Sequence, residues 1–237
     1  MKPIIKSNKS LIPSCDFTSL EKLSQLVNDT HDIEGIGAYK IGFEIVIPNG
    51  LKNVIEAIRD LSDLPIIYDH QKAGTDIPEN GSRFMKACKG VSAVIIFPMA
   101  GPETEAEWIK AARQGNMPII VGGEMTHKGY LASDGGFLEN SAPDRIYSQA
   151  AELGVNDFVV PGNKQDRIYR YREIVEMKIP KPVFYSPGFI TQGGSLNDSA
   201  KAAGDRFHAI VGRAIYSQKD MRKTAKDLVR GLGILQC

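Results

Sequence analysis

The sequence predicts a single (β/α)8 barrel domain over residues 1–237, and three observations point to this fold. Strand-like apolar runs alternate with amphipathic, helix-like stretches to give eight units. The length of 237 residues is close to the roughly 250 that such barrels use. No linker-like or low-complexity stretch separates the units. An open doubly wound sheet is the alternative, but Asp16-Phe17-Thr18 stands where its glycine fingerprint would follow the first strand.

The first half of the chain is expected to hold four strand–helix units. The first strand, at 11–15, leads into a helix at 18–27. Thr18 is its expected N-cap, because Glu21 follows at the capping-box spacing. The run at 91–97 is apolar throughout, as is typical of a strand buried on both faces of a parallel sheet. The remaining strands and helices of this half are expected, in chain order, at 37–41, 50–61, 65–69, 79–89 and 103–114.

The second half repeats the same rhythm. A helix is expected at 143–153, where Pro143 opens it and Gly154 closes it. A glycine-rich loop at 186–195 separates the seventh strand from a small helix near 197–203. The other elements of this half are expected at 117–121, 155–160, 165–177, 182–185, 207–211 and 219–232.

Composition narrows the classes of protein that the chain can belong to. The net charge of +1 and the 24% of charged residues show neither a nucleic-acid-binding footprint nor an acidic tail. Cys15, Cys88 and Cys237 lack metal-type spacing and are expected to be reduced thiols. The lysine-bearing start is no signal peptide, and no apolar run approaches the roughly 18 residues of a membrane span. We therefore expect a soluble cytoplasmic protein that binds neither nucleic acid nor membrane.

The positions just past the first three predicted strands hold alternating charges. In a barrel, such positions line the active site. A lysine held between two carboxylates stays protonated, and burying charges costs stability, so this set suggests chemistry that uses a proton and an electric field. A solvated, turn-forming strand exit is the alternative. The members are Asp16, Lys40, Asp69, Lys72 and Asp76.

Glycines, a glutamine and an arginine follow the last two predicted strands. Loops after strands seven and eight are the usual phosphate site of barrels. Glycine lets backbone N–H groups approach a phosphate, Arg213 offers a bidentate clamp, and Gln192 offers a neutral donor. Plain turns and a surface arginine are the alternative. The candidate phosphate-binding residues are Pro187, Gly188, Gln192, Gly193, Gly194, Gly212 and Arg213.

Taken in order, these motifs resemble the orotidine 5′-phosphate decarboxylase family over nearly the whole chain. The family hallmark is Asp-x-Lys-x-x-Asp-Ile-Pro after the third strand, and residues 69–78 here read Asp-His-Gln-Lys-Ala-Gly-Thr-Asp-Ile-Pro. The family also carries an aspartate after strand one (Asp16), Lys-Ile-Gly at strand two (40–42) and Ser or Thr after strand five (Thr126). Its Pro-Gly…Gln-Gly-Gly loop and closing Gly-Arg match the candidate phosphate-binding residues.

Two positions depart from the family pattern. Two residues separate Asp69 from Lys72 and three separate Lys72 from Asp76, where the family has one and two. Alternate residues of a strand share a face, so Asp69 and Lys72 can face one pocket only through a bulge or an early turn, which Gly74 makes feasible. Asn80 stands where the family commonly carries a threonine that reaches the ribose in the neighbouring subunit.

The resemblance implies decarboxylation of orotidine 5′-monophosphate to uridine 5′-monophosphate without metal or cofactor. Lys72 would be the proton donor, and Asp69 would crowd the substrate carboxylate. Lys40 and Asp16 would hold the ribose hydroxyls, while Thr126 would contact the base. Asp76 would reach into the partner's site, as would Asn80, which implies a homodimer with shared active sites.

Two alternatives to this function stay open. The first is a Mg²⁺-dependent sugar-phosphate lyase or decarboxylase such as 3-hexulose-6-phosphate synthase. Those relatives place a metal-binding glutamate at the end of strand two, where this chain has Lys40. The second is a non-catalytic nucleotide-phosphate-binding barrel. His70 and His127 lie near the site by sequence. His208 is expected to be structural or on the surface, and Trp108 is expected to pack in a helix.

Overall fold

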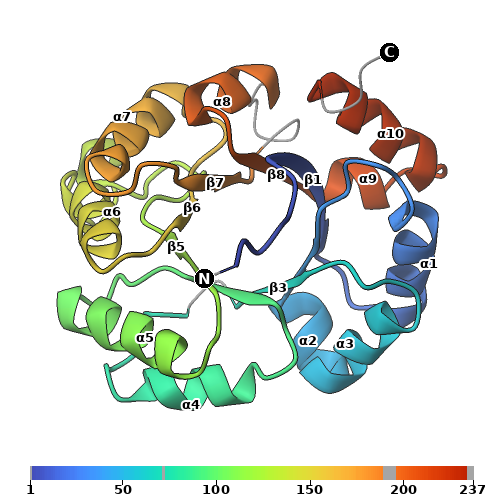
Figure 1. Cartoon of the computed structure of the whole chain (residues 1–237), viewed down its shortest axis with the longest axis horizontal. Coiled ribbons are helices and arrows are strands. Elements are labelled where there is room, and N and C mark those ends of the chain that lie inside the picture. Colours follow the sequence, from blue (N-terminus) through green and yellow to red (C-terminus); the bar gives the residue numbers. More distant parts are fainter. Residues whose placement is uncertain (1, 71–72, 189–195, 234–237) are drawn as a thin grey trace.

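The computed structural model describes residues 2–70, 73–188 and 196–233. Its eight strands pair in parallel, each with the next along the chain, and β8 pairs with β1 to close the barrel. Figure 1 shows the helices as a ring around these strands. The predicted (β/α)8 barrel is therefore confirmed. The strands are β1 (Lys9–Cys15), β2 (Tyr39–Gly42), β3 (Ile66–Asp69), β4 (Ala93–Ile96), β5 (Ile119–Gly122), β6 (Asp157–Val159), β7 (Val183–Ser186) and β8 (Phe207–Val211).

The helices between the strands match most of the expected ranges. They are α1 (Leu20–Thr30), α2 (Phe43–Asn49), α3 (Leu51–Arg59), α4 (Asn80–Ala87), α5 (Pro102–Gln114), the 3₁₀ turn η1 (Ala132–Asp134), α6 (Ala142–Glu152), α7 (Gln165–Glu176), α8 (Leu196–Ala203), α9 (Arg213–Tyr216) and α10 (Met221–Gly231).

Three details differ from the sequence-based expectations. Ser19, not Thr18, is the N-cap of α1, and its hydroxyl accepts a hydrogen bond from the Lys22 amide at 3.1 Å. Helix α2 differs from the expectation, because its apolar, β-branched sequence with Pro48 inside the helix gives no helical signal. Helix α9 and η1 are too short to produce a recognisable periodicity.

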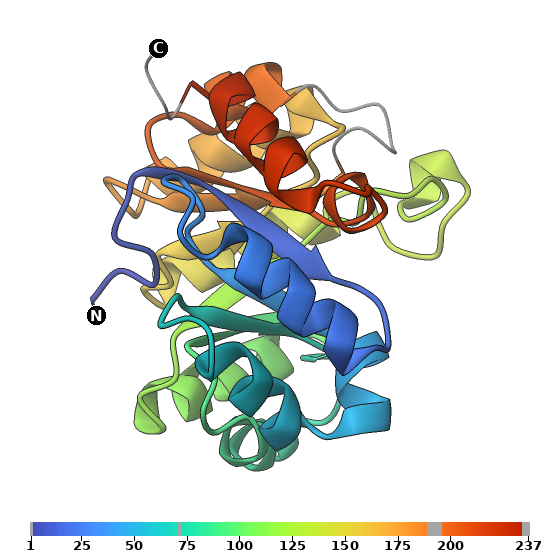
Figure 2. The same cartoon turned by 90° about the vertical axis from the view of Figure 1, so that its right-hand side faces the viewer.

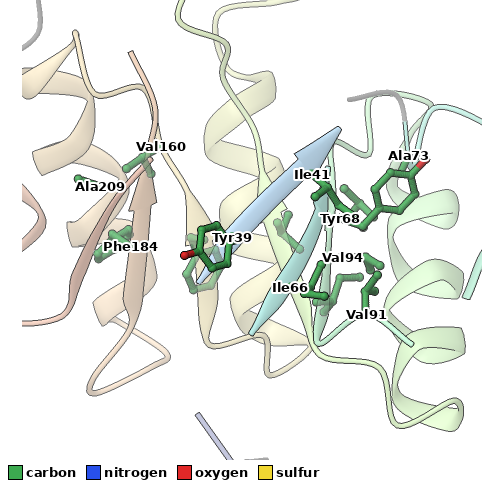
Figure 3. Close-up of a cluster of buried hydrophobic side chains, with 14 of the residues drawn as sticks. Tyr39, Ile41, Ile66, Tyr68, Ala73, Val91, Val94, Val160, Phe184 and Ala209 are labelled. Atoms are coloured by element: carbon green, nitrogen blue, oxygen red, sulfur yellow. The ribbon is translucent and has the colours of Figure 1, made fainter. Parts of the chain in front are cut away.

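Alternate residues of each strand face two different cores. One set points into the barrel and forms an interior cluster that includes Ile12, Ile67, Ile95, Ile120 and Ile210. The other set packs outward against the helices, and Figure 3 shows part of this outer cluster around Tyr39, Ile66 and Phe184. Because side chains alternate with period two, Ser14 and Asp16 follow Ile12 on the inward face, as Asp69 follows Ile67.

A long excursion joins β5 to α6. It spans residues 123–141, includes η1 and is pinned by a bridge between Leu131 and Leu138. In Figure 2 it is the yellow-green segment that projects at the end of the barrel where the strands terminate. The excursion therefore starts beside the face on which barrel active sites form.

His208 is a buried histidine at the opposite, amino-terminal end of the strands. Its Nδ1 lies 2.8 Å from the Ser10 hydroxyl, and its ring packs against Tyr185. Burial, helped by Arg206, lowers the pKa of His208 from the ordinary 6.5 to about 3. The structural role expected for this residue fits its position.

The lowered pKa of His208 should make the stability of the protein depend on pH. Because its folded pKa is below its unfolded pKa, the unfolded chain binds more protons below pH 6.5, so stability falls as pH drops from 6.5 toward 3. The contribution between pH 7 and pH 5 is about 2 kcal/mol. Urea unfolding at both pH values should show this loss reduced by that amount in His208→Gln. An equal loss in both proteins would contradict the assignment.

The remaining features concern the cysteines and the length of the helices. Cys15 and Cys88 are buried free thiols, whereas Cys237 lies outside the described residues. Among the helices described, none combines the length and apolar character needed to cross a lipid bilayer.

Candidate active site

A pocket of about 480 Å³ opens at the carboxyl-terminal mouth of the barrel. This volume is in the range of small-molecule sites. Most of the sequence-predicted residues that the structure describes meet here, although they come from six different strands. The predicted residues that line the pocket are Asp16, Lys40, Asp69, Thr126, Pro187, Gly188, Gly212 and Arg213.

Lys40 lies at the centre of the charged side of this pocket. Its Nζ is 3.1 Å from Asp16 Oδ1 and 3.3 Å from Asp69 Oδ2. The strand register explains the contact, because Lys40 pairs with Ser14 of β1, two residues before Asp16. The neighbouring pair, Gly42 with Asp69, brings the end of β3 to the same level. The expected alternation of carboxylate and ammonium is thus present for the first three members of the set.

The electrostatics of this trio keep the lysine charged. The Lys40 side chain is only 5% exposed. Burial alone would lower its pKa, but the carboxylates of Asp69 and Asp16 outweigh burial and raise the pKa of Lys40 above its ordinary value. A permanent cation therefore stands between two anions at the floor of the pocket.

Three small residues support this trio, and sequence reasoning missed the first. The Ser14 hydroxyl donates a hydrogen bond to Asp16 Oδ2 at 2.7 Å and so orients the carboxylate. A Cβ on Gly42 would come within 3.4 Å of Asp16 Oδ1, and a Cβ on Gly212 within 3.3 Å of Asp16 Oδ2. Ser14 lies two residues before Asp16 on an inward-facing strand, and this parity is the signal that could have identified it.

The ends of β7 and β8 bring part of the predicted phosphate site to the same pocket. Pro187 and Gly188 follow β7 directly, while Gly212 and Arg213 follow β8 and begin α9. Gly188 has a φ of +100°, a conformation that favours glycine. Gln192, Gly193 and Gly194, predicted in the same loop, lie outside the described residues.

The turn after β3 bears on the unusual motif spacing. Strand β3 ends at Asp69, and residues 73 and 74 already lie in a turn, where Gly74 has a φ of +85°. The Ala73 carbonyl accepts a hydrogen bond from the Phe97 amide at 2.8 Å, which ties this turn to the end of β4. Lys72, with its expected approach to Asp69, lies outside the described residues.

Asp76 and Asn80 do not line this pocket. Asp76 is exposed, and its carboxylate accepts hydrogen bonds from the Ile77 amide at 2.7 Å and from Asn80 Nδ2 at 2.8 Å. These bonds, with Asn80 the stronger influence, lower the pKa of Asp76. Thr104 and Trp108 of α5 bind the backbone carbonyls of Asp76 and Ile77, so the segment is held on the surface near α5.

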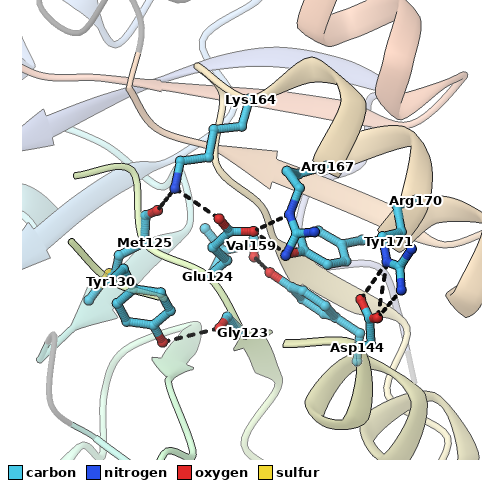
Figure 4. Close-up of polar contacts among 11 residues, drawn as sticks. Gly123, Glu124, Met125, Tyr130, Asp144, Val159, Lys164, Arg167, Arg170 and Tyr171 are labelled. Carbon is cyan, nitrogen blue, oxygen red and sulfur yellow. Dashed lines mark hydrogen bonds and ion pairs between the residues drawn. The ribbon is translucent and has the colours of Figure 1, made fainter. Parts of the chain in front are cut away.

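Thr126 enters the pocket from the start of the β5–α6 excursion. Its backbone carbonyl accepts a hydrogen bond from Asn163 Nδ2 at 3.0 Å. Beside it, the buried Glu124 contacts Lys164, Arg167 and Tyr171, as Figure 4 shows. Glu124 comes two residues after β5, but sequence alone gave no sign of its partners.

The aromatic and histidine residues near the site have packing contacts. His70 bonds the Tyr68 hydroxyl and packs edge-on against Phe84. His127 packs edge-on against Tyr130, and neither histidine lines the pocket. Trp108 is buried, as expected for a packing residue. Across the described ranges, no three His, Cys, Asp or Glu side chains gather in a group that could hold a metal ion.

This arrangement can bind an anionic ligand through Arg213 and present the fixed charges of the trio in the same pocket. A closed barrel with such a pocket at its carboxyl-terminal mouth defines the chain as a (β/α)8-barrel protein with a ligand site at the strand ends. The family model described as Orotidine 5′-phosphate decarboxylase / HUMPS family matches residues 9–228. The chain belongs to this family, which confirms the resemblance drawn from its motifs.

Individual relatives agree with this assignment. The chain is 30% identical to the orotidine 5′-phosphate decarboxylase of Thermococcus kodakarensis, over 92% of this chain and 94% of the relative. It is 27% identical to that of Methanocaldococcus jannaschii, over 91% and 95%. A crystal structure of the Methanocaldococcus jannaschii orotidine 5′-monophosphate decarboxylase, complexed with the inhibitor BMP, matches with a TM-score of 0.82 at 25% identity, covering 94% of this chain and 98% of that one.

Proposed function

We propose that this protein decarboxylates orotidine 5′-monophosphate to uridine 5′-monophosphate and carbon dioxide, without a metal or a cofactor. The observation that carries the proposal is the position of Lys40 between Asp16 and Asp69, in a pocket that Arg213 also lines. Membership of the family and relatives of the same name along nearly the whole chain support it.

The chemical problem is a carbanion. Loss of carbon dioxide leaves negative charge at C6 of the pyrimidine, so catalysis needs preorganised positive charge at that atom. Lys72 stabilises this charge and then protonates the carbon, which makes it the proton donor. Asp69 lies beside the substrate carboxylate and its repulsion is relieved as carbon dioxide leaves. Lys40 and Asp16 bind the ribose hydroxyls, and Thr126 contacts the base.

The phosphate is remote from the reacting carbon but contributes to the rate. Reactions this slow in water require about 20 kcal/mol of barrier reduction, more than one ammonium can supply. Binding energy from Arg213, Gln192 and the loop glycines is used to orient the substrate at the reacting centre.

The active unit is a homodimer with shared sites, and the reaction takes place in the cytoplasm. Asp76 and Asn80 are exposed or half-buried and bonded to each other at the surface, which leaves them available to a partner's site. Buried free thiols at Cys15 and Cys88 suit a reducing compartment.

Lys40 also argues against the Mg²⁺-dependent lyase. Lys40 lies in β2, the strand on which the metal-dependent relatives place a carboxylate ligand, and a buried cation there repels a divalent ion.

A single assay separates the three functions. Loss of orotate absorbance is followed with orotidine 5′-monophosphate, with and without a chelator. We expect turnover that the chelator does not change. Turnover abolished by the chelator would favour a metal-dependent enzyme. Uridine 5′-monophosphate binding without any turnover would identify a non-catalytic barrel.

Arg213→Ala should test the phosphate assignment. We expect kcat/KM to fall by about 100-fold, mostly through KM, because a charge-assisted anchor for the phosphate is lost. Arg230→Ala is the matched control, since Arg230 is an exposed arginine that pairs with Asp227 on α10. Steady-state kinetics of both variants decide the matter, and unchanged kinetics in Arg213→Ala would remove Arg213 from the site.

A further inference from the structure

Glu124, Met125 and Thr126 stand at the start of the β5–α6 excursion. Each accepts a hydrogen bond from Asn163 or Lys164, the two residues before α7. Lys164 Nζ donates to Glu124 Oε1 at 2.8 Å and to the Met125 carbonyl at 3.0 Å. Asn163 Nδ2 donates to the Thr126 carbonyl at 3.0 Å. Met125 and Thr126 line the candidate active site. The backbone of the pocket wall is therefore fastened from outside the pocket.

Glu124 is the centre of this arrangement, because both of its carboxylate oxygens are occupied. Oε1 accepts from Lys164, and Oε2 accepts from Arg167 Nε at 2.9 Å and from the Tyr171 hydroxyl. The Glu124 side chain is 2% exposed. Its burial raises the pKa, but the bonds from Lys164, Tyr171 and Arg167 outweigh burial, so the pKa of Glu124 is lowered and the group stays ionised.

The hydrogen-bond partners of Glu124 come from α7 and the residue before it. Arg167 and Tyr171 are four residues apart and project from the same side of α7, and Lys164, the residue before this helix, reaches the same carboxylate. The Arg167 guanidinium lies over the Tyr171 ring, and the Tyr147 ring of α6 packs against Tyr171. A buried carboxylate with two cations costs desolvation energy, which makes such a group weak evidence for stability alone. It does define a single position for the segment that carries it.

We propose that Glu124, with Lys164, is a positioning residue that sets where Thr126 meets the substrate base. This inference rests on the proposed function and extends it to residues outside the pocket. Glu124 touches no substrate atom and acts through residues 125 and 126. Since Thr126 contacts the base in both the ground state and the transition state, its displacement removes uniform binding, which raises KM and leaves kcat nearly unchanged.

The test compares the ion pair of Lys164 and Glu124 with the ion pair of Arg170 and Asp144. Glu124→Gln keeps the shape of the side chain but leaves Lys164 and Arg167 side by side without their anion. Lys164→Met keeps the stem and removes the bonds to Glu124 and Met125. Arg170→Gln is the matched control, because Arg170 pairs with Asp144 of α6 one turn away and touches none of residues 124–126 (Figure 4).

We expect KM for orotidine 5′-monophosphate to rise about tenfold or more in Glu124→Gln and Lys164→Met, with kcat changed less than about threefold. The double variant should be no worse than the more severe single variant, because the two residues act as one unit. Lys164→Arg should recover most of the loss, and Arg170→Gln should stay within about twofold of wild type. Hydrogen exchange in peptides covering 123–130 should accelerate in Glu124→Gln and not in Arg170→Gln.

Several outcomes would overturn the inference. Unchanged KM in both Glu124→Gln and Lys164→Met would do so, as would a fall in Tm with no change in KM, since that pattern is purely structural. If Glu124→Gln does not fold, Asn163→Ala tests the Thr126 contact directly, and an unchanged KM there also overturns it. If wild type shows no decarboxylation, the proposed function fails by itself. The positioning role is then decided by whether Glu124→Gln, unlike Arg170→Gln, weakens uridine 5′-monophosphate binding.

Discussion

Replacing Lys72 with alanine is expected to lower kcat by about four orders of magnitude, while the affinity for uridine 5′-monophosphate stays within about tenfold of wild type. Under the proposed mechanism the variant loses both the cation that stabilises the carbanion and the proton donor, and each contribution is worth roughly 10²-fold or more. Both act on charge that exists only in the transition state, so ground-state binding largely survives. Single-turnover kinetics and calorimetric titration of the nucleotide provide the measurement.

Two further variants make this result specific. Lys52→Ala is the control, because Lys52 is an exposed lysine paired with Glu56 on α3, and it should leave kinetics unchanged. Lys72→Cys, alkylated to carry an aminoethyl group, should regain a substantial part of the turnover because the ammonium returns at nearly the same reach. Turnover above a few per cent of wild type in Lys72→Ala would exclude Lys72 as the proton donor.

Much of the fold could be predicted because each element carries its own local pattern. Runs such as 91–97 indicate buried parallel strands, and eight alternating units leave few architectures other than a barrel. Helix α2 could not be predicted in this way, since its β-branched residues and Pro48 favour other structures, and it forms where β2 runs directly into it. The N-cap of α1 shifted by one residue because Thr18 and Ser19 offer the same chemistry.

Some residues of the candidate site could be predicted from the sequence and others could not. Asp16, Lys40 and Asp69 could be assigned because strand ends of a barrel converge, and period-two alternation places all three inward. The partners of Glu124 could not, because Lys164 and Arg167 lie 40 and 43 residues away and follow no local rule. The packing of α7 places this strand-end glutamate at the centre of a buried network, which the sequence does not show.

Lys40→Met is the second variant with a large expected effect, and it separates stability from catalysis. Methionine keeps the stem but leaves Asp16 and Asp69 facing each other without the ammonium that now lies 3.1 and 3.3 Å from them. We expect kcat/KM to fall by about 10³-fold or more, because the ribose contact is lost and the charge network is broken.

The Lys40→Met variant should also be less stable than wild type, and the loss of stability should depend on pH. Without the lysine, the negative charges of Asp16 and Asp69 repel each other in the folded variant at neutral and alkaline pH. The unfolding free energy should be about 2 kcal/mol below wild type at pH 8 and closer to it at pH 4, a modest loss because Asp16 is partly exposed and screened. Chemical unfolding at both pH values measures this.

The double variant Asp16→Asn with Lys40→Met then decides what Lys40 does. Removing one carboxylate relieves the repulsion, so the double variant should regain most of the stability lost at pH 8. Activity should not return with it, because the ribose contacts and the alternation of charge beside Asp69 are still missing. Recovery of both stability and turnover would show that Lys40 only neutralises its neighbours. Recovery of stability alone would show that activity needs the charged pair of Asp16 and Lys40 for more than the neutralisation of charge.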